Sequence, residues 1–135
     1  MTDIFIYGTL RHQPLLDIVP SYYNSLEFCQ GTIAEMQGSD VYASLAKYTS
    51  AGNISYIHFR NVRDKVPNYH EVFIDEGDVD MLEALRTLRD NNYDGVLIPD
   101  HTPEVTCDAP WHAGMAYALG YVRAGMKALG IEIEP

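Results

Sequence analysis

The chain has 135 residues, 47% of them hydrophobic, a size and composition that indicate a single globular domain. Its formal net charge of −10 makes nucleic acid and anionic membrane surfaces poor partners. The sequence contains no apolar run of about 18 residues, so no transmembrane helix is expected. Residues 1–7 lack the basic and apolar regions of a signal peptide, which predicts a cytoplasmic protein.

Strand signals occur at four places along the chain. A short aromatic and β-branched stretch at residues 3–7 is followed by a Gly-Thr turn. Further apolar stretches lie at residues 25–29, 54–59 and 95–98. The strand at residues 54–59 has the clearest alternation, with His58 on one side and Phe59 on the other.

Helix signals alternate with these strands. A first amphipathic stretch can be capped by Ser39 or Asp40, and a second can begin at Asp78 or Asp80. Pro110 suits the first position of a last helix. The intervening segments 62–68 and 102–109 indicate loops, and residues 70–74 indicate a short extended segment. The alternation from residue 25 onward therefore predicts an α/β fold with three βα units and a parallel sheet.

Reactive side chains follow each of the three later strands. Cys29 ends the strand at residues 25–29, His58 lies near the end of the next strand, and Asp100 and His101 directly follow the third. Because the carboxyl ends of parallel strands share one edge, these groups should meet there, where α/β barrels have their active sites.

A thiolate, an imidazole and a carboxylate suit a transition ion such as Fe²⁺, Mn²⁺ or Zn²⁺, whereas Mg²⁺ prefers oxygen ligands. Taken singly, the same residues have other interpretations. Cys29 can be a small buried apolar residue, His58 a hydrogen-bonded core residue, and the Asp-His pair a loop cap. Cys107 lies within a loop and has no partner at ligand spacing, so we expect it not to be a metal ligand.

Four segments resemble successive motifs of the mannonate dehydratase family, in the family's order. They are EFCQGTIAEM at residues 27–36, IHFRNVR at 57–63, DEGDVDM at 75–81 and IPDH at 98–101. The resemblance covers about residues 21–129. It implies part of a TIM barrel and the dehydration of D-mannonate to 2-keto-3-deoxy-D-gluconate in hexuronate (glucuronate) catabolism. It also implies a divalent Mn²⁺ or Fe²⁺ ion.

The resemblance assigns roles to individual residues. Cys29, His58 and Asp100 correspond to metal ligands, and His101 corresponds to a catalytic acid or base. This set suits the reaction, because removing a proton next to a carboxylate requires charge stabilisation and a general base. Arg60 follows the second strand and can bind the substrate carboxylate or form an ion pair with neighbouring carboxylates.

The first nineteen residues suggest a separate origin. DIFIYGTLR at residues 3–11 resembles the opening strand and turn of gamma-glutamylcyclotransferase-like proteins. This divides the chain into a segment of cyclotransferase-like appearance at residues 1–19 and a dehydratase-like portion at residues 20–135. The simpler alternative is that residues 3–7 add one more strand to the sheet. For function, the alternatives are a cyclotransferase-like enzyme or an inactive truncated or fused relic.

The length of the chain sets a further expectation. A complete (β/α)₈ barrel takes about 250 residues, so three βα units would leave sheet edges uncovered. We therefore expect a partial barrel that forms homo-oligomers through open edges and has impaired activity, with a small sugar acid as its substrate. The family's remaining histidine ligand comes from an earlier strand, and His12 is not in a matching context.

Overall fold

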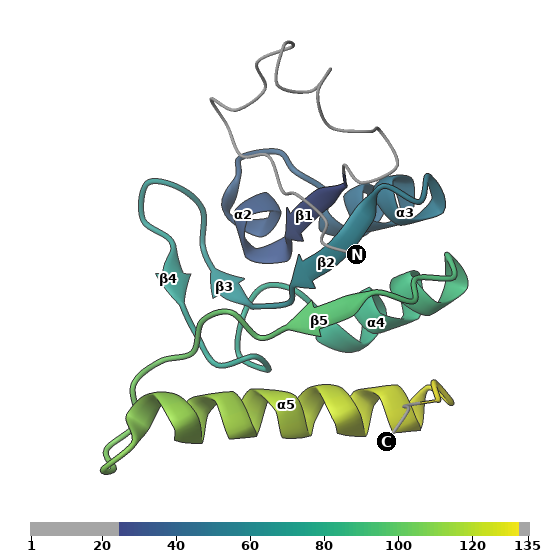
Figure 1. Cartoon of the computed structure of the whole chain (residues 1–135). Coiled ribbons are helices and arrows are strands. Elements are labelled where there is room, and N and C mark those ends of the chain that lie inside the picture. Colours follow the sequence, from purple (N-terminus) through teal and green to yellow (C-terminus); the bar gives the residue numbers. More distant parts are fainter. Residues whose placement is uncertain (1–24, 133–135) are drawn as a thin grey trace, which may run out of the picture.

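Three parallel strands form the centre of the computed structural model, which describes residues 25–132 (Figure 1). Strand β1 spans Leu26–Cys29, β2 spans Ile54–His58 and β5 spans Val96–Ile98, in the order β1-β2-β5. Both pairings are parallel, as the alternation of strands and helices predicted. The strand expected at residues 3–7 lies outside the described residues.

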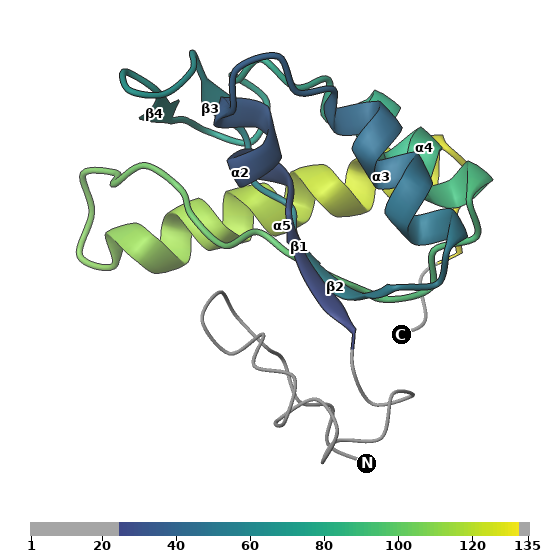
Figure 2. The same cartoon turned by 90° about the horizontal axis from the view of Figure 1, so that it is seen from above.

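Three longer helices follow the strands in the predicted order. Helix α3 spans Val41–Ser50, α4 spans Met81–Asp90 and α5 spans Pro110–Ala128. Figure 2 shows α3 and α4 on the same side of β1 and β2, whereas α5 crosses behind these strands in that view. This arrangement of a parallel sheet with helices on one face is the one expected of successive βα units.

The helix starts are fixed by the side chains that the sequence offered as caps. Asp40, rather than Ser39, accepts a hydrogen bond from the Ala43 amide at 2.9 Å. Asp80, rather than Asp78, accepts from the amides of the second and third residues of α4. Each carboxylate thus satisfies amides that have no partner within the helix and lies at the favourable end of its dipole.

A short helix that sequence patterns did not indicate follows β1 directly. Helix α2 spans Gln30–Glu35 and has no side-chain cap at its start. Its first residue is fully buried, and its side-chain amide donates to the Arg60 carbonyl oxygen at 3.3 Å. An added Cβ at Gly31 would lie 2.6 Å from Arg60 Cζ, so glycine is required for this close approach. Tertiary contacts, not helix propensity, therefore hold α2 in place.

The connection between β2 and α4 contains a second small sheet. Strand β3 spans Val62–Arg63 and pairs antiparallel with β4 at His70–Glu71. The sequence indicated a loop at residues 62–68 and an extended stretch at 70–74, because strands of two residues are too short to show alternation.

The two faces of the main sheet differ in character. Phe28 and Ile57 point to the helices and join the buried core with side chains such as Leu45 and Leu85. The opposite face carries Cys29 and its strand partner His58, and α3 and α4 lie on the other side of the strands (Figure 2). No helix in this range is both long and apolar enough to cross a membrane.

Asn61 organises the long connection after β2 from inside the protein. Its side chain is 1% exposed and donates to the carbonyl oxygens of Ile74 and Val79, each at 2.9 Å. Its Oδ1 accepts from the amides of Val62 and Val79. A single side chain thus joins three points of the connection that leads from the sheet edge to α4.

We predict that Asn61→Ala lowers the free energy of unfolding by about 3 kcal/mol, because several buried backbone groups lose their partners. Asn68 is exposed, so Asn68→Ala should change stability by less than about 0.5 kcal/mol. Urea unfolding of both variants measures the difference. Equal effects would contradict the role assigned to Asn61.

Candidate metal centre

The three side chains predicted from the strand ends lie together. Cys29, His58 and Asp100 each offer a ligand atom, and these atoms all lie within 4.8 Å of one another. All three residues are partly buried. Among residues 25–132, no other group of three such side chains meets this spacing.

Strand register explains how the three residues meet. Cys29 and His58 are direct partners in the parallel pairing of β1 with β2, so their side chains leave the same face of the sheet. Ile98 is the partner of His58 in β5, and Asp100 follows two residues later. The backbone of Asp100 has φ of +29°, in the left-handed region that non-glycine residues rarely adopt. Residues held in such conformations are often found at functional sites.

The imidazole of His58 is flanked by two carboxylates. Its Nδ1 lies 2.9 Å from Glu27 Oε1 and 3.5 Å from Asp100 Oδ1. Glu27 lies two residues before Cys29 on the same strand, so it shares the face that carries the candidate ligands. Its side chain is only 4% exposed.

Arg60 is the cation of the site and is almost fully buried, with 7% of its side chain exposed. Its Nη1 lies 2.5 Å from Glu71 Oε1, its Nη2 3.7 Å from Glu35 Oε2 and its Nε 3.3 Å from Asp100 Oδ2. Burial by itself would lower the pKa of Arg60, but Cys29 and Glu71 outweigh burial and raise that pKa. The guanidinium therefore stays charged, and it links Asp100 to the small sheet formed by β3 and β4.

His101 lies at the rim of the same site. Its side chain is 61% exposed, and its Nδ1 lies 3.0 Å from Asp100 Oδ2 and 4.0 Å from Glu71 Oε1. An open pocket of about 710 Å³ is lined by the three candidate ligands together with Glu27, Arg60 and His101. The imidazole can thus exchange protons with a molecule in this pocket while a carboxylate orients its ring.

The donor set and spacing fit a transition ion. Atoms bound tetrahedrally to one ion at about 2.0–2.3 Å are about 3.3–3.8 Å apart. From separations within 4.8 Å, the three side chains would have to close by at most about 1 Å or slightly more. Thiolate, imidazole and carboxylate donors together favour a transition ion over Mg²⁺ or Ca²⁺. Cys107, expected to be no ligand, is an exposed free cysteine outside the group.

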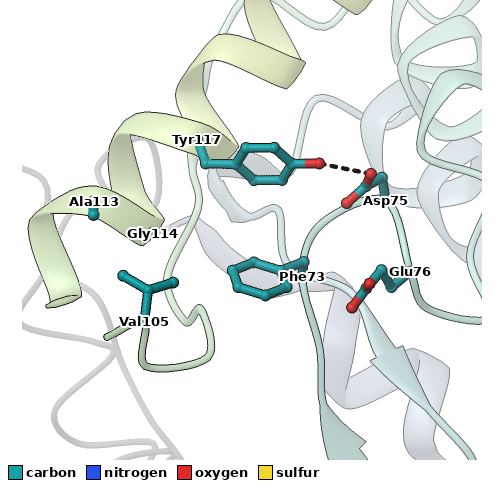
Figure 3. A pocket seen from close by; sticks show the side chains of 7 residues that line it. All are labelled: Phe73, Asp75, Glu76, Val105, Ala113, Gly114 and Tyr117. Atoms are coloured by element: carbon teal, nitrogen blue, oxygen red, sulfur yellow. Dashed lines mark hydrogen bonds between the residues drawn. The ribbon is translucent and has the colours of Figure 1, made fainter. Parts of the chain in front are cut away.

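A second cavity of about 290 Å³ lies between α5 and the loop after β4 (Figure 3). The ring of Tyr117 packs edge-on against Phe73 with centroids 5.7 Å apart, and its hydroxyl donates to Asp75 Oδ2 at 2.7 Å. This hydrogen bond raises the pKa of Tyr117. None of the candidate ligands lines this cavity, and its contacts serve to hold the start of α5 against the loop.

Sequence reasoning missed the carboxylates that surround the candidate ligands. Glu27 could have been found from the two-residue period of its strand, which places it on the face of Cys29. Glu35 and Glu71 could not, because they come from the unexpected helix α2 and from the two-residue strand β4.

The sequence and the fold both resemble those of known proteins. The model of the D-mannonate dehydratase (UxuA) family matches residues 4–133. A mannonate dehydratase of Lactococcus lactis subsp. cremoris is 30% identical over 93 residues, which cover 64% of this chain and 26% of the relative. A mannonate dehydratase of Streptococcus pneumoniae is 28% identical over 136 residues, which cover 93% of this chain and 37% of the relative.

A solved structure of a mannonate dehydratase has a similar fold. The crystal structure of mannonate dehydratase from Streptococcus suis serotype 2 superimposes with a TM-score of 0.65 at 26% identity, covering 90% of this chain and 38% of that one. The chain thus spans about a quarter to two fifths of the length of these relatives. The family match begins at residue 4, whereas the proposed division near residue 19 remains a prediction. Because the family model matches nearly the whole chain, this protein belongs to the D-mannonate dehydratase family.

Proposed function

We propose that this chain supplies the metal-binding edge of a mannonate dehydratase, a carbon-oxygen lyase that converts D-mannonate to 2-keto-3-deoxy-D-gluconate in hexuronate breakdown. The observation that carries this proposal is the convergence of Cys29, His58 and Asp100 within 4.8 Å of one another. The named activity of the relatives supports the choice of substrate. The three parallel βα units are proposed to be part of a TIM barrel, as the structural neighbour supports.

The proposed metal is Mn²⁺ or Fe²⁺, held by Cys29, His58 and Asp100. When bound, such an ion stabilises the negative charge that develops beside the substrate carboxylate. The remaining ligand expected for the family has no counterpart among the described residues. A divalent ion bound by three protein groups retains positions for water or substrate.

His101 is the proposed acid or base. The reaction removes a hydrogen from the carbon next to the carboxylate and a hydroxyl from the following carbon, and the enol so formed becomes the 2-keto group. One proton must be accepted and the departing hydroxyl must gain one to leave as water. An imidazole at the pocket rim, oriented by Asp100, is suited to proton transfer of this kind.

Arg60 is proposed to bind the substrate carboxylate. All three of its nitrogens already face carboxylates in the protein, so the substrate would have to share or replace one of these partners. Its ion pairs also position Asp100, and the two roles are separable by experiment. The alternative of a cyclotransferase-like enzyme depends on residues 7–10, which lie outside the described residues.

We predict that the full chain binds one Mn²⁺ or Co²⁺ ion and that Cys29→Ala weakens this binding by at least about 100-fold. Removing a residue that only hydrogen-bonds to a metal ligand typically weakens metal binding about 10–100-fold, and removing the ligand itself should cost more. Cys107→Ala is the matched control and should bind the ion as the unmodified chain does. Isothermal titration measures both. Equal binding by the two variants would refute the assignment of Cys29.

We predict weak turnover of D-mannonate by the 135-residue chain tested alone with added Mn²⁺. The site-bearing face is open, with Val96 60% exposed, so water and substrate are poorly positioned. His101→Ala should abolish whatever activity is measured without changing metal affinity. Turnover at about 1–10³ s⁻¹ would contradict the expected impairment, and metal binding without any turnover would favour an inactive relic.

We predict that Arg60→Ala lowers the free energy of unfolding by about 3 kcal/mol, because it leaves the partly buried carboxylates of Glu35 and Asp100 without a cation. Arg86→Ala removes an exposed arginine paired with Glu83 on α4 and should cost less than about 1 kcal/mol. Chemical unfolding measures both.

For the substrate role, Arg60→Lys should weaken D-mannonate binding to the metal-loaded chain, and unchanged binding would leave Arg60 with the positioning role alone.

A further inference from the structure

Glu27 is a buried carboxylate whose position the core does not explain. Its side chain is 4% exposed, yet it lies on the sheet face that carries the candidate ligands rather than on the face packed against the helices. Its Oε2 is buried without a hydrogen-bond partner among residues 25–132. Burying a carboxylate with one oxygen unsatisfied costs stability, so a compensating role is expected at this position.

Two donor groups face Glu27, the imidazole of His58 and the hydroxyl of Tyr56. Glu27 Oε1 lies 2.9 Å from His58 Nδ1, which is hydrogen-bond distance. The strand register makes this contact a property of the fold. Glu27 pairs with Tyr56 and Cys29 with His58, so the carboxylate and the imidazole leave adjacent strands on one face.

Tyr56 completes the surroundings of the carboxylate. Burial and the adjacent Glu27 raise the pKa of Tyr56, so its hydroxyl stays protonated. The rings of Tyr56 and His58 lie 5.4 Å apart and are tilted by 51°. The imidazole is therefore held between an aromatic ring and a carboxylate, which restricts its rotation.

We propose that Glu27 is a positioning residue, which accepts the Nδ1 hydrogen of His58 and so fixes this imidazole in the tautomer that presents Nε2 to a divalent transition ion. A histidine that binds a metal through one nitrogen commonly donates its other N–H to a carboxylate, which orients the ring and increases its basicity. This inference rests on the proposed metal site and adds a residue to it. Glu27 is not itself a ligand here, because it does not belong to the group within 4.8 Å.

The first test measures Co²⁺ binding by the full chain. Calorimetric titration gives the affinity, and visible spectroscopy records the absorption of the bound ion. We expect Glu27→Ala to weaken Co²⁺ binding 10–100-fold and Glu27→Gln to weaken it less, since an amide oxygen can still accept the hydrogen bond without the charge. The thiolate-to-cobalt absorption should persist in both variants, because Cys29 is intact. Glu83→Gln changes a carboxylate on α4 that pairs with Arg86 and should leave binding unchanged.

The second test needs no metal. Long-range ¹H–¹⁵N NMR of the metal-free chain should show His58 protonated at Nδ1, and a mixture of tautomers in Glu27→Ala. Glu27→Gln should melt at or above the temperature of the unmodified chain, because it removes the buried charge and keeps a hydrogen-bond acceptor. This combination, with weaker metal binding but undiminished stability, would not arise if Glu27 were merely structural.

The outcomes separate this inference from the proposed function. Co²⁺ binding by the unmodified chain with equal affinity in Glu27→Ala would overturn the role of Glu27 and leave the metal site standing. If the unmodified chain binds no Co²⁺, the proposed metal site is wrong. The tautomer of His58 in the metal-free chain would then show whether Nδ1 donates its hydrogen to Glu27. If both variants fail to fold, protonation of His58 at Nε2 in the unmodified chain would still refute the inference.

Discussion

The parallel register of β1 and β2 is the constraint on which the site depends. It pairs Cys29 with His58, and the next pairing places Ile98 beside His58, so the chain must deliver Asp100 to the same edge. A shift of one residue would turn every side chain of a strand to the opposite face. The thiol would then face the helices, and Phe28 would leave the core.

The register is stabilised on the face opposite the site. Phe28 and Ile57 pack with residues of α3 and α4, so the apolar core fixes which strand residues point inward. The functional face gains little from this burial. It carries a thiol, an imidazole and carboxylates, and its apolar residues Val96 and Ile98 are exposed. The core therefore holds in place the polar face that carries the candidate ligands.

Charge organises the edge where the strands end. Arg60 lies among the carboxylates of Glu35, Glu71 and Asp100, which arrive from different elements. Asn61, the next residue, ties the connection that follows to the interior through four hydrogen bonds. Two adjacent buried polar residues thus link the sheet edge, the short helix α2 and the small sheet into one unit. Two apolar residues in place of Arg60 and Asn61 could supply neither a positive charge beside Asp100 nor hydrogen bonds to the buried backbone groups.

The sequence predicted the features that depend on local pattern. Alternation marked the strands, Asp40 and Asp80 were among the expected caps, and the strand ends marked Cys29, His58 and Asp100 as neighbours. Helix α2 and the β3–β4 pair were not predicted, because long-range contacts to Arg60 and Asn61 stabilise them. The roles of His101 and Arg60 rest on resemblance, since no local pattern distinguishes a catalytic histidine from an exposed one.

The proposed metal site requires that Cys29, His58 and Asp100 together bind one transition ion at the end of the parallel strands. X-ray diffraction at the absorption edge of bound Mn²⁺ or Co²⁺ tests it most directly, because the anomalous signal locates the ion itself. We expect a single strong peak within about 2.0–2.4 Å of Cys29 Sγ, His58 Nε2 and an Asp100 carboxylate oxygen. A peak elsewhere on the chain, or one with no sulfur in contact, would contradict it.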